Sequence, residues 1–579
     1  MKLIEALEIL RRPVNCSART VRVSLACGFT PLHLKTFLEA QLRELFPQSN
    51  VSVISGRYGD LVGNIERQDL SELDAMALPI EWSDLDSRLG VRTLGGWRPD
   101  DLIDIVENVK ESAERIQKVI SEAARHVRVV ISMPTLPLPP IFTTSSIQAG
   151  SIETRLHSIV GLTAESLSQI QGVCLASQQY LGLISPLNDR YDLKADLAVG
   201  FPYTLRHASS VATSFSKLIR NRPTKKGLIT DLDDVLWGGI VGDDGIDGIS
   251  WELDRHTQMH GLYQQVLSAL AGTGVLIGVA SKNDAQTVKQ AFERTDLLLS
   301  KNDLFPIEVN WSRKSDSVQR ILKTWNIGAD SVIFINDSPM ELAEVKAAFP
   351  ELECRLFPKN DDQGIWDLLV DLRAAYEKTI VTHEDRLRLN SIRGAGDWQR
   401  ESTLAGGPSD DFLQSADASI TFEFNGGCDN TRAFALVNKT NQFNLNGKRF
   451  ADHEWRRLFD NQTSFLLTAS YKDKFGPLGT IAVLFGSMHG NIVHLSGWVM
   501  SCRAFSRRIE YQCLKFLFDN LNAEEILFEF EPTQKNTVLH EFLSDLLKMP
   551  PVQGCSLAKH DFLARIPSLF HHIEVSVHA

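Results

Sequence analysis

Two aspartates with one residue between them, Asp231 and Asp233, stand directly after the short apolar run 227–230. If that run is a buried strand and the chain leaves the sheet at once, both carboxylates face the same pocket. Carboxylates that share a pocket repel one another and favour a hard cation such as Mg²⁺. The simpler interpretation is an aspartate-rich turn before a helix, which is the commoner case for one such segment taken alone.

Further polar residues follow later apolar runs of the same region. They are Ser281, Lys282 and Asn283 after 275–280, Lys314 after the polar segment 310–313, and Asn336 and Asp337 after 331–335. Helical segments separate the runs, at 260–271, 284–293 and 315–325. This alternation predicts a doubly wound α/β domain, in which ligands bind at the carboxyl ends of the strands.

These four segments, in this order and each at a strand end or in the following loop, resemble the four motifs of the haloacid-dehalogenase superfamily of phosphoryl-transfer enzymes. The resemblance implies that Asp231 is the nucleophile that takes the phosphoryl group as an aspartyl phosphate. It implies that Asp233 protonates the leaving oxygen and then activates water. The residues that it places around the phosphoryl group are Ser281, Lys282, Asn283 and Lys314.

The same resemblance implies a Mg²⁺ site formed by the Asp231 carboxylate, the main-chain carbonyl of Asp233 and the Asp337 carboxylate. Related sequences commonly carry two acids where this chain has Asn336 and Asp337. The loss of one charge is expected to weaken Mg²⁺ binding without abolishing it. An acid restored by Asn336→Asp is therefore expected to bind Mg²⁺ more tightly.

The stretch 228–245 looks like one branch of this superfamily, the FkbH-like proteins of subfamily IIIC. Two later segments, 437–444 and 501–503, and the stretch 532–537 resemble that family's C-terminal domain. The resemblance implies an α/β fold class with three domains, of which two are doubly wound parallel-sheet domains. The domains are an SGNH-hydrolase-like one at 1–210, a haloacid-dehalogenase-like phosphatase at 222–385 and an α+β domain like the GNAT acyltransferases at 418–575.

Members of the FkbH-like family that serve polyketide assembly are glyceryl transferases and phosphatases. The resemblance implies that this chain takes a glyceryl unit from 1,3-bisphosphoglycerate, holds it as a cysteine thioester and passes it to an acyl carrier protein. Mg²⁺-dependent dephosphorylation at Asp231 accompanies the transfer. Two other functions stay open: a Mg²⁺-dependent phosphatase of small molecules without acyl transfer, and a binding module whose catalytic site has decayed.

Cys502 is the candidate thiol of the transfer reaction. A solitary cysteine is more often a small buried hydrophobe, and that interpretation is favoured for the other seven. Cys502 differs in its basic setting, because positive charge lowers the pKa of a thiol and attracts a phosphorylated substrate. The arginines near it in sequence are Arg503, Arg507 and Arg508. Arg503 and Asn441 are the residues expected to bind substrate there.

The other members of that site are less determined by the sequence. Two histidines upstream, His489 and His494, are candidates for the base that activates the thiol. Three polar residues either line the same site or cap a helix end; they are Asn438, Thr440 and Asn444. The segment 503–510 lacks the glycines that hold the pyrophosphate of coenzyme A, which favours a carrier-protein pantetheine arm instead.

The segment 1–200 predicts another α/β domain. Strands are expected at 19–27, 51–55 and 127–132, and helices at 32–46 and 99–126. The first strand ends in Cys27-Gly28-Phe29-Thr30, without the Gly-Asp-Ser of an SGNH hydrolase. Candidates for a remnant His/Asp pair are Asp192, Asp196 and His207. Docking or scaffolding is the expected role of this domain, and the polar segment 208–226 is expected to lead to the next one.

Length, charge and cysteine usage bound the class of protein. The 579 residues predict about three to five domains, and 43% hydrophobic with 23% charged residues is typical of chains with buried cores. Sixty basic residues against 72 acidic ones give a net charge of −12, so a nucleic-acid partner is not expected. Eight cysteines without a CxxC pair argue against a disulfide framework or a zinc site. No signal peptide or 18-residue apolar stretch is found, so no membrane partner is expected and the cytoplasm is the expected location.

Overall fold

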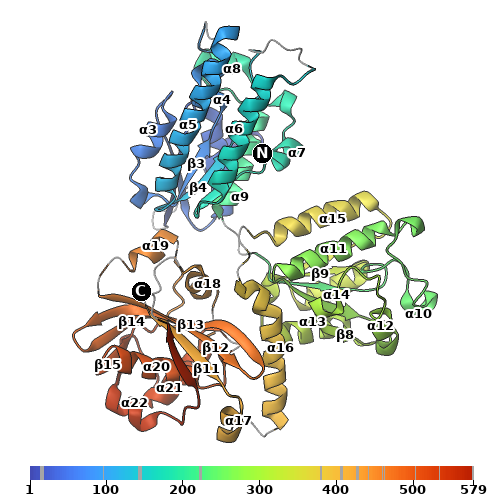
Figure 1. The fold of residues 1–579 in the computed structure, drawn as a ribbon, viewed down its shortest axis with the longest axis vertical. Coiled ribbons are helices and arrows are strands. Elements are labelled where there is room, and N and C mark those ends of the chain that lie inside the picture. Colours follow the sequence, from blue (N-terminus) through green and yellow to red (C-terminus); the bar gives the residue numbers. More distant parts are fainter. Residues whose placement is uncertain are drawn as a thin grey trace. The chain divides into compact units, whose positions relative to one another are not determined.

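The computed structural model describes residues 1–13, 19–94, 97–140, 147–220, 224–378, 381, 383–404, 409–424, 430–440, 442–450, 452–459, 461, 463–501, 504–533 and 535–576. The chain divides into two compact units, Met1–Arg222 and Pro223–Ala579. The described residues form three β-sheets, one in the first unit and two in the second (Figure 1). No helix in this part of the chain combines the length and the apolar character needed to cross a membrane.

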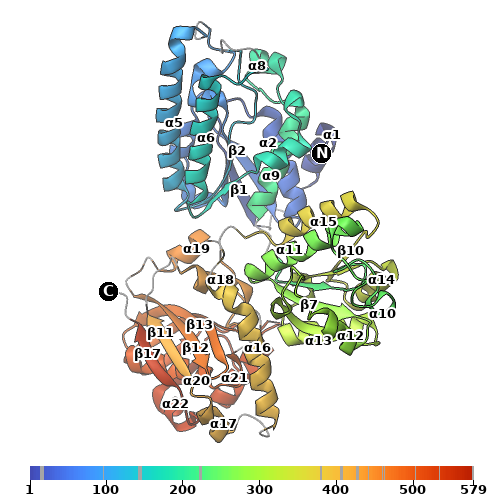
Figure 2. The ribbon, with the colours of Figure 1, turned by 45° about the vertical axis from the view of Figure 1, so that its right-hand side comes forward.

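The first unit is built on a five-stranded sheet in the order β2-β1-β3-β4-β5, in which every neighbouring pair is parallel. Its strands are β1 Thr20–Leu25, β2 Asn50–Ser55, β3 Ala75–Pro79, β4 Arg128–Ser132 and β5 Val173–Leu175. Its helices are α1 Leu3–Arg11, α2 Leu32–Leu45, α3 Leu61–Glu66, α4 Trp82–Leu85, α5 Leu102–Ala123, α6 Ser151–Ser168, α7 Gln178–Ile184, α8 Leu193–Val199 and α9 Leu205–Arg220. Two hydrophobic clusters cover the two faces of the sheet, one with α5 and α6 and the other with α2 and α9 (Figure 2).

Two features of the first unit differ from the sequence prediction. The strand β3 is missing from the prediction because Ala75–Pro79 contains no β-branched residue, although all five residues are buried. The segment 208–226 is mostly not a connection, since α9 continues to Arg220 and buries Val211 and Phe215 in the core. Small alanines and serines at helical spacing make this buried face inconspicuous in the sequence.

The second unit begins with a five-stranded sheet in the order β10-β9-β6-β7-β8, again with all pairs parallel. Its strands are β6 Gly227–Thr230, β7 Leu276–Ser281, β8 Leu304–Val309, β9 Val332–Asn336 and β10 Glu353–Leu356. Its helices are α10 Val241–Asp244, α11 Gln258–Gly272, α12 Ala285–Ala291, α13 Lys314–Trp325, α14 Pro339–Ala348 and α15 Asp362–Ala375. Residues of α11 and α15 cover one face and residues of α13 and α14 the other, so this sheet is doubly wound as predicted.

The third sheet is mixed and has the order β16-β15-β14-β13-β12-β11-β17. The pairs β14/β15 and β11/β17 are parallel, and the other four pairs are antiparallel. Its strands are β11 Ser419–Phe424, β12 Ser464–Asp473, β13 Gly476–His489, β14 Ile492–Met500, β15 Glu525–Phe528, β16 Ser556–Ala558 and β17 His572–Ser576. The helices of this part are α16 His383–Leu404, α17 Asp410–Ser415, α18 Thr431–Lys439, α19 Asp452–Arg457, α20 Ile509–Asn520, α21 Thr537–Leu547 and α22 Lys559–Arg565.

The core of the third sheet lies mainly against α20, α21 and α22, and a smaller cluster joins its other side to α18 and α19. Two parallel sheets and one mixed sheet agree with the predicted α/β class. The chain divides into two compact units, so the division into three domains stays a prediction.

Candidate active site

Asp231 is the first residue after β6, the central strand of the second sheet. The chain leaves β6 toward β7 on one side and later returns to β9 on the other, and such a reversal opens a crevice at the carboxyl ends of the strands. The backbone N–H of Asp231 donates to the carbonyl of Ile335 at 3.1 Å, and its Oδ1 accepts from the N–H of Leu232 at 2.8 Å. The carboxylate is therefore fixed at the predicted position.

The other oxygen of Asp231 meets two donors from different strands. Lys314 Nζ lies 2.6 Å and Asn336 Nδ2 lies 2.7 Å from Asp231 Oδ2. Lys314 begins α13, is only 2% exposed, and also donates to the carbonyl of Ala280 at 3.0 Å. Burial raises the pKa of Asp231, and the ammonium of Lys314 opposes that rise.

Glu341, in the first turn of α14, is a member of this site that the sequence analysis does not single out. Its Oε2 accepts from Asn336 Nδ2 at 2.9 Å and lies 3.1 Å from Lys314 Nζ, and its Oε1 lies 2.8 Å from Lys282 Nζ. Burial alone would raise the pKa of Glu341, but the two lysines and the amide outweigh it and lower that pKa. The sequence signal was hidden, because a glutamate three residues after Ser338 reads as an ordinary helix cap.

Asp233 lies two residues further along the same turn and is held by three donors. Its Oδ1 accepts from Trp237 Nε1 at 2.9 Å and from the N–H of Val241 at 3.1 Å. Its Oδ2 accepts from Asn283 Nδ2 at 2.8 Å, and that amide also lies 3.4 Å from the hydroxyl of the buried Ser281. The structure therefore brings the strand ends of β6 and β7 together as the motifs predict.

Asp337 follows β9 and pairs with a lysine. Lys359 Nζ lies 3.0 Å from Asp337 Oδ2 and 2.6 Å from Asp234 Oδ2, so one ammonium joins two carboxylates. Asp234 has a left-handed backbone, with φ +53°, and the Lys359 hydrogen bond helps to lower its pKa against the opposing effect of burial. Lys359 is a second member of the site that the sequence analysis did not name.

The residues implied to hold Mg²⁺ are compatible with it in donor chemistry. Within the described ranges, no group of three or more His, Cys, Asp or Glu side chains is arranged to hold a metal ion. The implied set needs only two carboxylates and one carbonyl, all of them oxygen donors of the kind Mg²⁺ prefers. Asp231 and Asp337 follow the paired ends of β6 and β9, where Thr230 lies opposite Ile335. They thus share one edge of the sheet, with Lys359 neutralising Asp337 in this arrangement.

The predicted thiol site of the third sheet is only partly visible. Cys502, Arg503 and Asn441 lie outside the described residues. The loop that joins β14 to α20 is anchored by the N–H of Ser501, which donates to the carbonyl of Ile481 at 2.7 Å. Ser506 and Arg508 have left-handed backbones there, with φ +66° and +60°. The loop therefore turns sharply into α20 at two positions that usually favour glycine.

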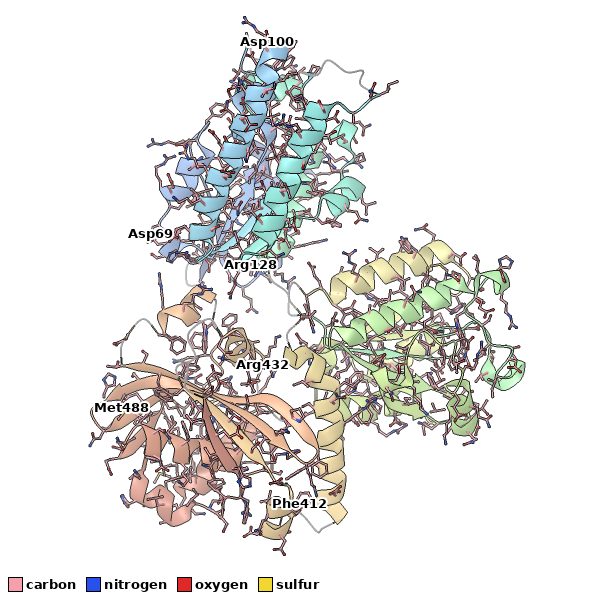
Figure 3. The ribbon with its side chains drawn as sticks, viewed as in Figure 1. Asp69, Asp100, Arg128, Phe412, Arg432 and Met488 are labelled. Carbon is pink, nitrogen blue, oxygen red and sulfur yellow. The ribbon has the colours of Figure 1, made fainter. Side chains whose placement is uncertain are left out.

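Arg507, one of the arginines near Cys502 in sequence, is buried. It is 3% exposed, and its guanidinium lies 4.1 Å from the ring centre of Trp398 and 5.5 Å from that of Tyr471. Trp398 itself packs on Phe412, which Figure 3 labels on α17. A guanidinium between two aromatic rings is part of the core, so Arg507 is not placed to attract a substrate as the sequence suggested.

Arg508 also binds groups of the chain itself. It donates to the carbonyl of Ser568 at 2.9 Å and pairs with Asp410 at 2.7 Å. Of the three arginines near Cys502 in sequence, Arg507 and Arg508 thus have partners within the chain, and Arg503 lies outside the described residues.

Of the two histidines proposed as a base, His489 ends β13 and His494 lies near the start of β14, at the far end of this hairpin from the loop after β14. His494 pairs with Ser487 across the β13/β14 hairpin, beside the Met488 that Figure 3 labels, and the rings of His489 and His494 are 4.9 Å apart. The six residue-to-residue steps from His494 to Met500 span about 20 Å at the rise of a strand. Neither histidine reaches the loop after β14, so both assignments are wrong.

The polar residues of the segment 437–444 have structural roles where they are described. Asn438 exchanges two hydrogen bonds with the backbone of Phe450, at 2.8 and 3.1 Å. Asn444 donates to the carbonyl of Thr440 at 3.1 Å and accepts from the N–H of Gly447 at 2.8 Å. Asn444 therefore caps the end of α18 at Thr440, which is one of the two interpretations left open by the sequence, whereas Asn438 holds the backbone of the loop at Phe450.

The first unit contains no exposed nucleophile at the end of β1. Cys27 is buried and donates to the carbonyl of Phe29, and burial raises the pKa of its thiol. Asp192 caps α8 and Asp196 accepts from the hydroxyl of Tyr191, so neither pairs with a histidine. The proposed remnant His/Asp pair is therefore not formed.

His207 of this unit belongs instead to a closed polar cluster in the core. It is 0% exposed and pairs with the hydroxyls of Thr135 at 2.8 Å and Ser185 at 2.9 Å. The buried Glu81 accepts from the same Thr135 hydroxyl and from the hydroxyl of Tyr203 at 2.6 Å. Because each of these groups is satisfied inside the protein, the cluster holds the unit together rather than presenting a site.

His207 leads to a prediction about acid stability. Burial, with a smaller contribution from Arg190, lowers the pKa of His207 from 6.5 to about 3. The unfolded chain therefore binds a proton that the folded unit excludes. The contribution of the neutral His207 to the free energy of unfolding is fully present above pH 6.5. It is lost as the pH drops toward 3, by about 1.4 kcal/mol per pH unit. In His207→Gln this acid sensitivity is expected to disappear, because glutamine does not titrate and its amide bonds both hydroxyls.

The loss of stability on acidification is measured by hydrogen exchange of the β4 and α9 peptides in the full chain. Exchange is compared at about pH 7 and about pH 5, after correction for intrinsic exchange rates. Wild type is expected to lose more protection than His207→Gln on acidification. Glu81 and Asp84, whose pKa values burial raises, titrate in both proteins, so the difference isolates His207. Equal losses would contradict a buried neutral imidazole.

Comparison with known proteins is informative at the level of the fold. Neither protein-family models nor curated proteins match the chain. The crystal structure of the N-terminal part of the protein BF1531 from Bacteroides fragilis, which contains a phosphatase domain and is complexed with Mg, is similar with a TM-score of 0.53. That likeness has 19% identity and covers 66% of this chain and 100% of that one.

Two further solved structures show weaker likeness. An uncharacterized protein from Corynebacterium glutamicum has a TM-score of 0.19 and 15% identity, over 27% of this chain and 98% of its own. Phospholipase A1 from Streptomyces albidoflavus has a TM-score of 0.26 and 12% identity, over 36% of this chain and 100% of its own. Both scores are too low to support an argument, so the comparisons establish that the chain is similar in fold to a protein that contains a phosphatase domain.

Proposed function

We propose that the β6–β10 sheet carries a Mg²⁺-dependent phosphatase of the haloacid-dehalogenase type. The observation that carries this proposal is the Asp231 carboxylate at the end of the central strand, with Lys314 Nζ 2.6 Å from its Oδ2. A carboxylate fixed by a buried ammonium is suited to attack phosphorus, because the same cation neutralises the charge that develops on the phosphoryl oxygens. The fold likeness to a structure with a phosphatase domain supports the same reaction class.

The chemistry divides into two steps. A carboxylate oxygen of Asp231 bonds to phosphorus as the ester P–O bond breaks, and Asp233 gives its proton to the departing oxygen. Asp233 then takes a proton from water, which attacks the aspartyl phosphate and releases inorganic phosphate and free Asp231. The donors Trp237, Val241 and Asn283 hold Asp233 in place for both transfers. A Mg²⁺ bound by Asp231, Asp337 and the carbonyl of Asp233 would reduce the negative charge around the phosphoryl group.

We further propose that the whole chain is an FkbH-like glyceryl transferase. The thiolate of Cys502 attacks the acyl phosphate of 1,3-bisphosphoglycerate, phosphate leaves, and the acyl group passes from Cys502 to the pantetheine thiol of an acyl carrier protein. Arg503 and Asn441 bind the substrate there, and the remaining 3-phosphate is cleaved at Asp231. The sequence resemblance over nearly the whole chain supports this proposal. The cytoplasm, where 1,3-bisphosphoglycerate is available, is the corresponding location.

Intact-protein mass spectrometry after incubation with 1,3-bisphosphoglycerate and Mg²⁺, with and without an acyl carrier protein, tests the transfer. A glyceryl or phosphoglyceryl adduct that maps to Cys502 and moves to the carrier is expected. Cys502→Ala is expected to lose the adduct and the carrier loading, because no thiol remains to form the thioester. Cleavage of para-nitrophenyl phosphate by the same sample reports separately on the Asp231 site.

Cys555→Ala, a change at a second cysteine of the same sheet region, is the matched control and is expected to load the carrier normally. An adduct that persists in Cys502→Ala would exclude the covalent thiol. Phosphate release without any carrier loading would leave the simpler function, a Mg²⁺-dependent phosphatase of small molecules. That second candidate is favoured by one observation, the burial of Arg507, whose side chain is only 3% exposed.

A further inference from the structure

Asn336 joins two carboxylates with one amide group. Its Nδ2 donates to Asp231 Oδ2 at 2.7 Å and to Glu341 Oε2 at 2.9 Å, while its Oδ1 accepts from the N–H of Ser338 at 2.7 Å. The residue is 0% exposed, so no water competes for these bonds. An amide nitrogen carries two hydrogens and both are used here, whereas an ionised carboxylate carries none.

Glu341 connects the same two donors from the other side. Its Oε2 lies within reach of Asn336 Nδ2 and, at 3.1 Å, of Lys314 Nζ, and these are the two groups that hold Asp231 Oδ2. The four side chains form a closed ring in which carboxylates and donors alternate: Asp231, Lys314, Glu341 and Asn336. Such a ring restricts the rotation of the Asp231 carboxylate more than a single ion pair does, because any displacement strains two contacts at once.

We propose that Glu341 is a positioning residue, which holds the Asp231 carboxylate for attack on phosphorus by fixing both Lys314 and Asn336. This inference rests on the proposed phosphatase function. It also gives the amide at position 336 a role, since Asn336 ends β9 and donates both of its hydrogens, one to Asp231 and one to Glu341 in the first turn of α14. The expectation that Asn336 weakens Mg²⁺ binding stays a prediction, and the geometry adds a hydrogen-bonding role for its amide.

The charges around the ring agree with this arrangement. Two carboxylates, Asp231 and Glu341, face two ammonium groups, Lys314 and Lys282. Asn336→Asp adds a third carboxylate to a buried group and removes both amide hydrogens, so repulsion turns the Asp231 carboxylate away. Glu341→Gln removes one carboxylate and leaves Lys314 with a single anionic partner. The double change Asn336→Asp with Glu341→Gln keeps two carboxylates and one amide and only exchanges their places.

The exchange is the basis of the test. With para-nitrophenyl phosphate and Mg²⁺, each single variant is expected to lower kcat by about 100-fold with KM changed by less than about threefold, because binding is retained and orientation is lost. The double variant is expected to recover to within about tenfold of wild type, a coupling between the two positions. A purely structural role would not produce recovery in kcat by exchange of the two groups.

Glu344→Gln is the matched control. Glu344 lies on the same helix one turn further on, and accepts from the N–H and hydroxyl of Ser315 at 3.0 and 2.8 Å without belonging to the ring. It is expected to keep kcat within about threefold of wild type. A readout besides turnover is the adduct of beryllium trifluoride, a phosphoryl mimic, on Asp231, followed by fluorine NMR in the presence of Mg²⁺. Its occupancy is expected to follow kcat across wild type and the three ring variants.

Two results would overturn the inference: Asn336→Asp with wild-type kcat, or a double variant no better than the poorer single one. Failure of the proposed function is distinguishable from this. If wild type cleaves no phosphoester, the phosphatase proposal fails. The free energy of unfolding in urea then tests separately whether positions 336 and 341 are coupled in the ring. Stability lost in both single variants and regained in the double one supports the ring, and additive losses refute it.

Discussion

The Asp231→Asn variant is expected to lose phosphoester cleavage by at least about 10⁴-fold in kcat. A neutral amide oxygen does not form the aspartyl phosphate, so the reaction loses its first covalent step. The replacement also places an NH₂ group or a weaker acceptor against Lys314 and Asn336, both of which are donors. Activity is measured as phosphate release from para-nitrophenyl phosphate and from 3-phosphoglycerate esters, with Mg²⁺ present.

The fold is expected to survive Asp231→Asn, because Lys314 keeps Glu341 as an anionic partner. Asp243→Asn, on the exposed helix α10, is the control for a change of charge near the same strand and is expected to leave kcat unchanged. Mass spectrometry must show that the new asparagine has not reverted to aspartate by deamidation. Turnover that persists in an unreverted sample would refute the nucleophile assignment.

Lys314→Met has the second large effect, and it is expected in both activity and stability. The ammonium lies between Asp231 and Glu341 and is 2% exposed, so its removal leaves two buried carboxylates with fewer partners. Loss of one member of a buried ion pair typically costs about 3–5 kcal/mol. The kcat is expected to fall by about 10³-fold, since the developing phosphoryl charge also loses its counter-ion.

Urea unfolding followed by tryptophan fluorescence measures the stability change, because Trp325 lies buried at the end of the same helix. Lys323→Met, on the exposed side of α13, is the matched control and is expected to stay within about 0.5 kcal/mol of wild type. An unchanged unfolding midpoint in Lys314→Met would show that the buried pair does not stabilise the domain.

The strands that carry the motifs were predictable because local chemistry determines them. The segments that become β6, β7 and β9 are apolar runs rich in β-branched residues, bounded by polar turns, and they are almost wholly buried. The strand β3 and the helix α9 were not predictable in the same way. Their small residues are buried only because neighbouring elements cover them, and single-sequence patterns do not contain that information.

In the candidate site, too, the sequence pattern does not show which neighbours surround a single side chain. Asp231, Ser281 and Lys314 come together because parallel strands end at one edge, which the sequence order already implies. Glu341 was missed and Arg507 was misjudged, because a helix-cap pattern and a run of arginines have the same appearance whether the side chain is exposed or buried. Their roles depend on what packs beside them: two lysines for Glu341, and the rings of Trp398 and Tyr471 for Arg507.

The pairing of β17 with β11 has a consequence for protein synthesis. In the third sheet Ser419 of β11 lies opposite His572 of β17. The strand β11 is synthesised first in this sheet and can pair with β17 only after β17, the last strand, has been synthesised. The β6–β10 sheet has all its strands once residue 356 has left the ribosome, whereas β11 keeps one backbone edge unpaired until residues 572–576 emerge. Unpaired edges recruit strands from other chains. Truncations that remove β17 are therefore expected to make the nascent third sheet prone to aggregation while leaving the two parallel sheets intact.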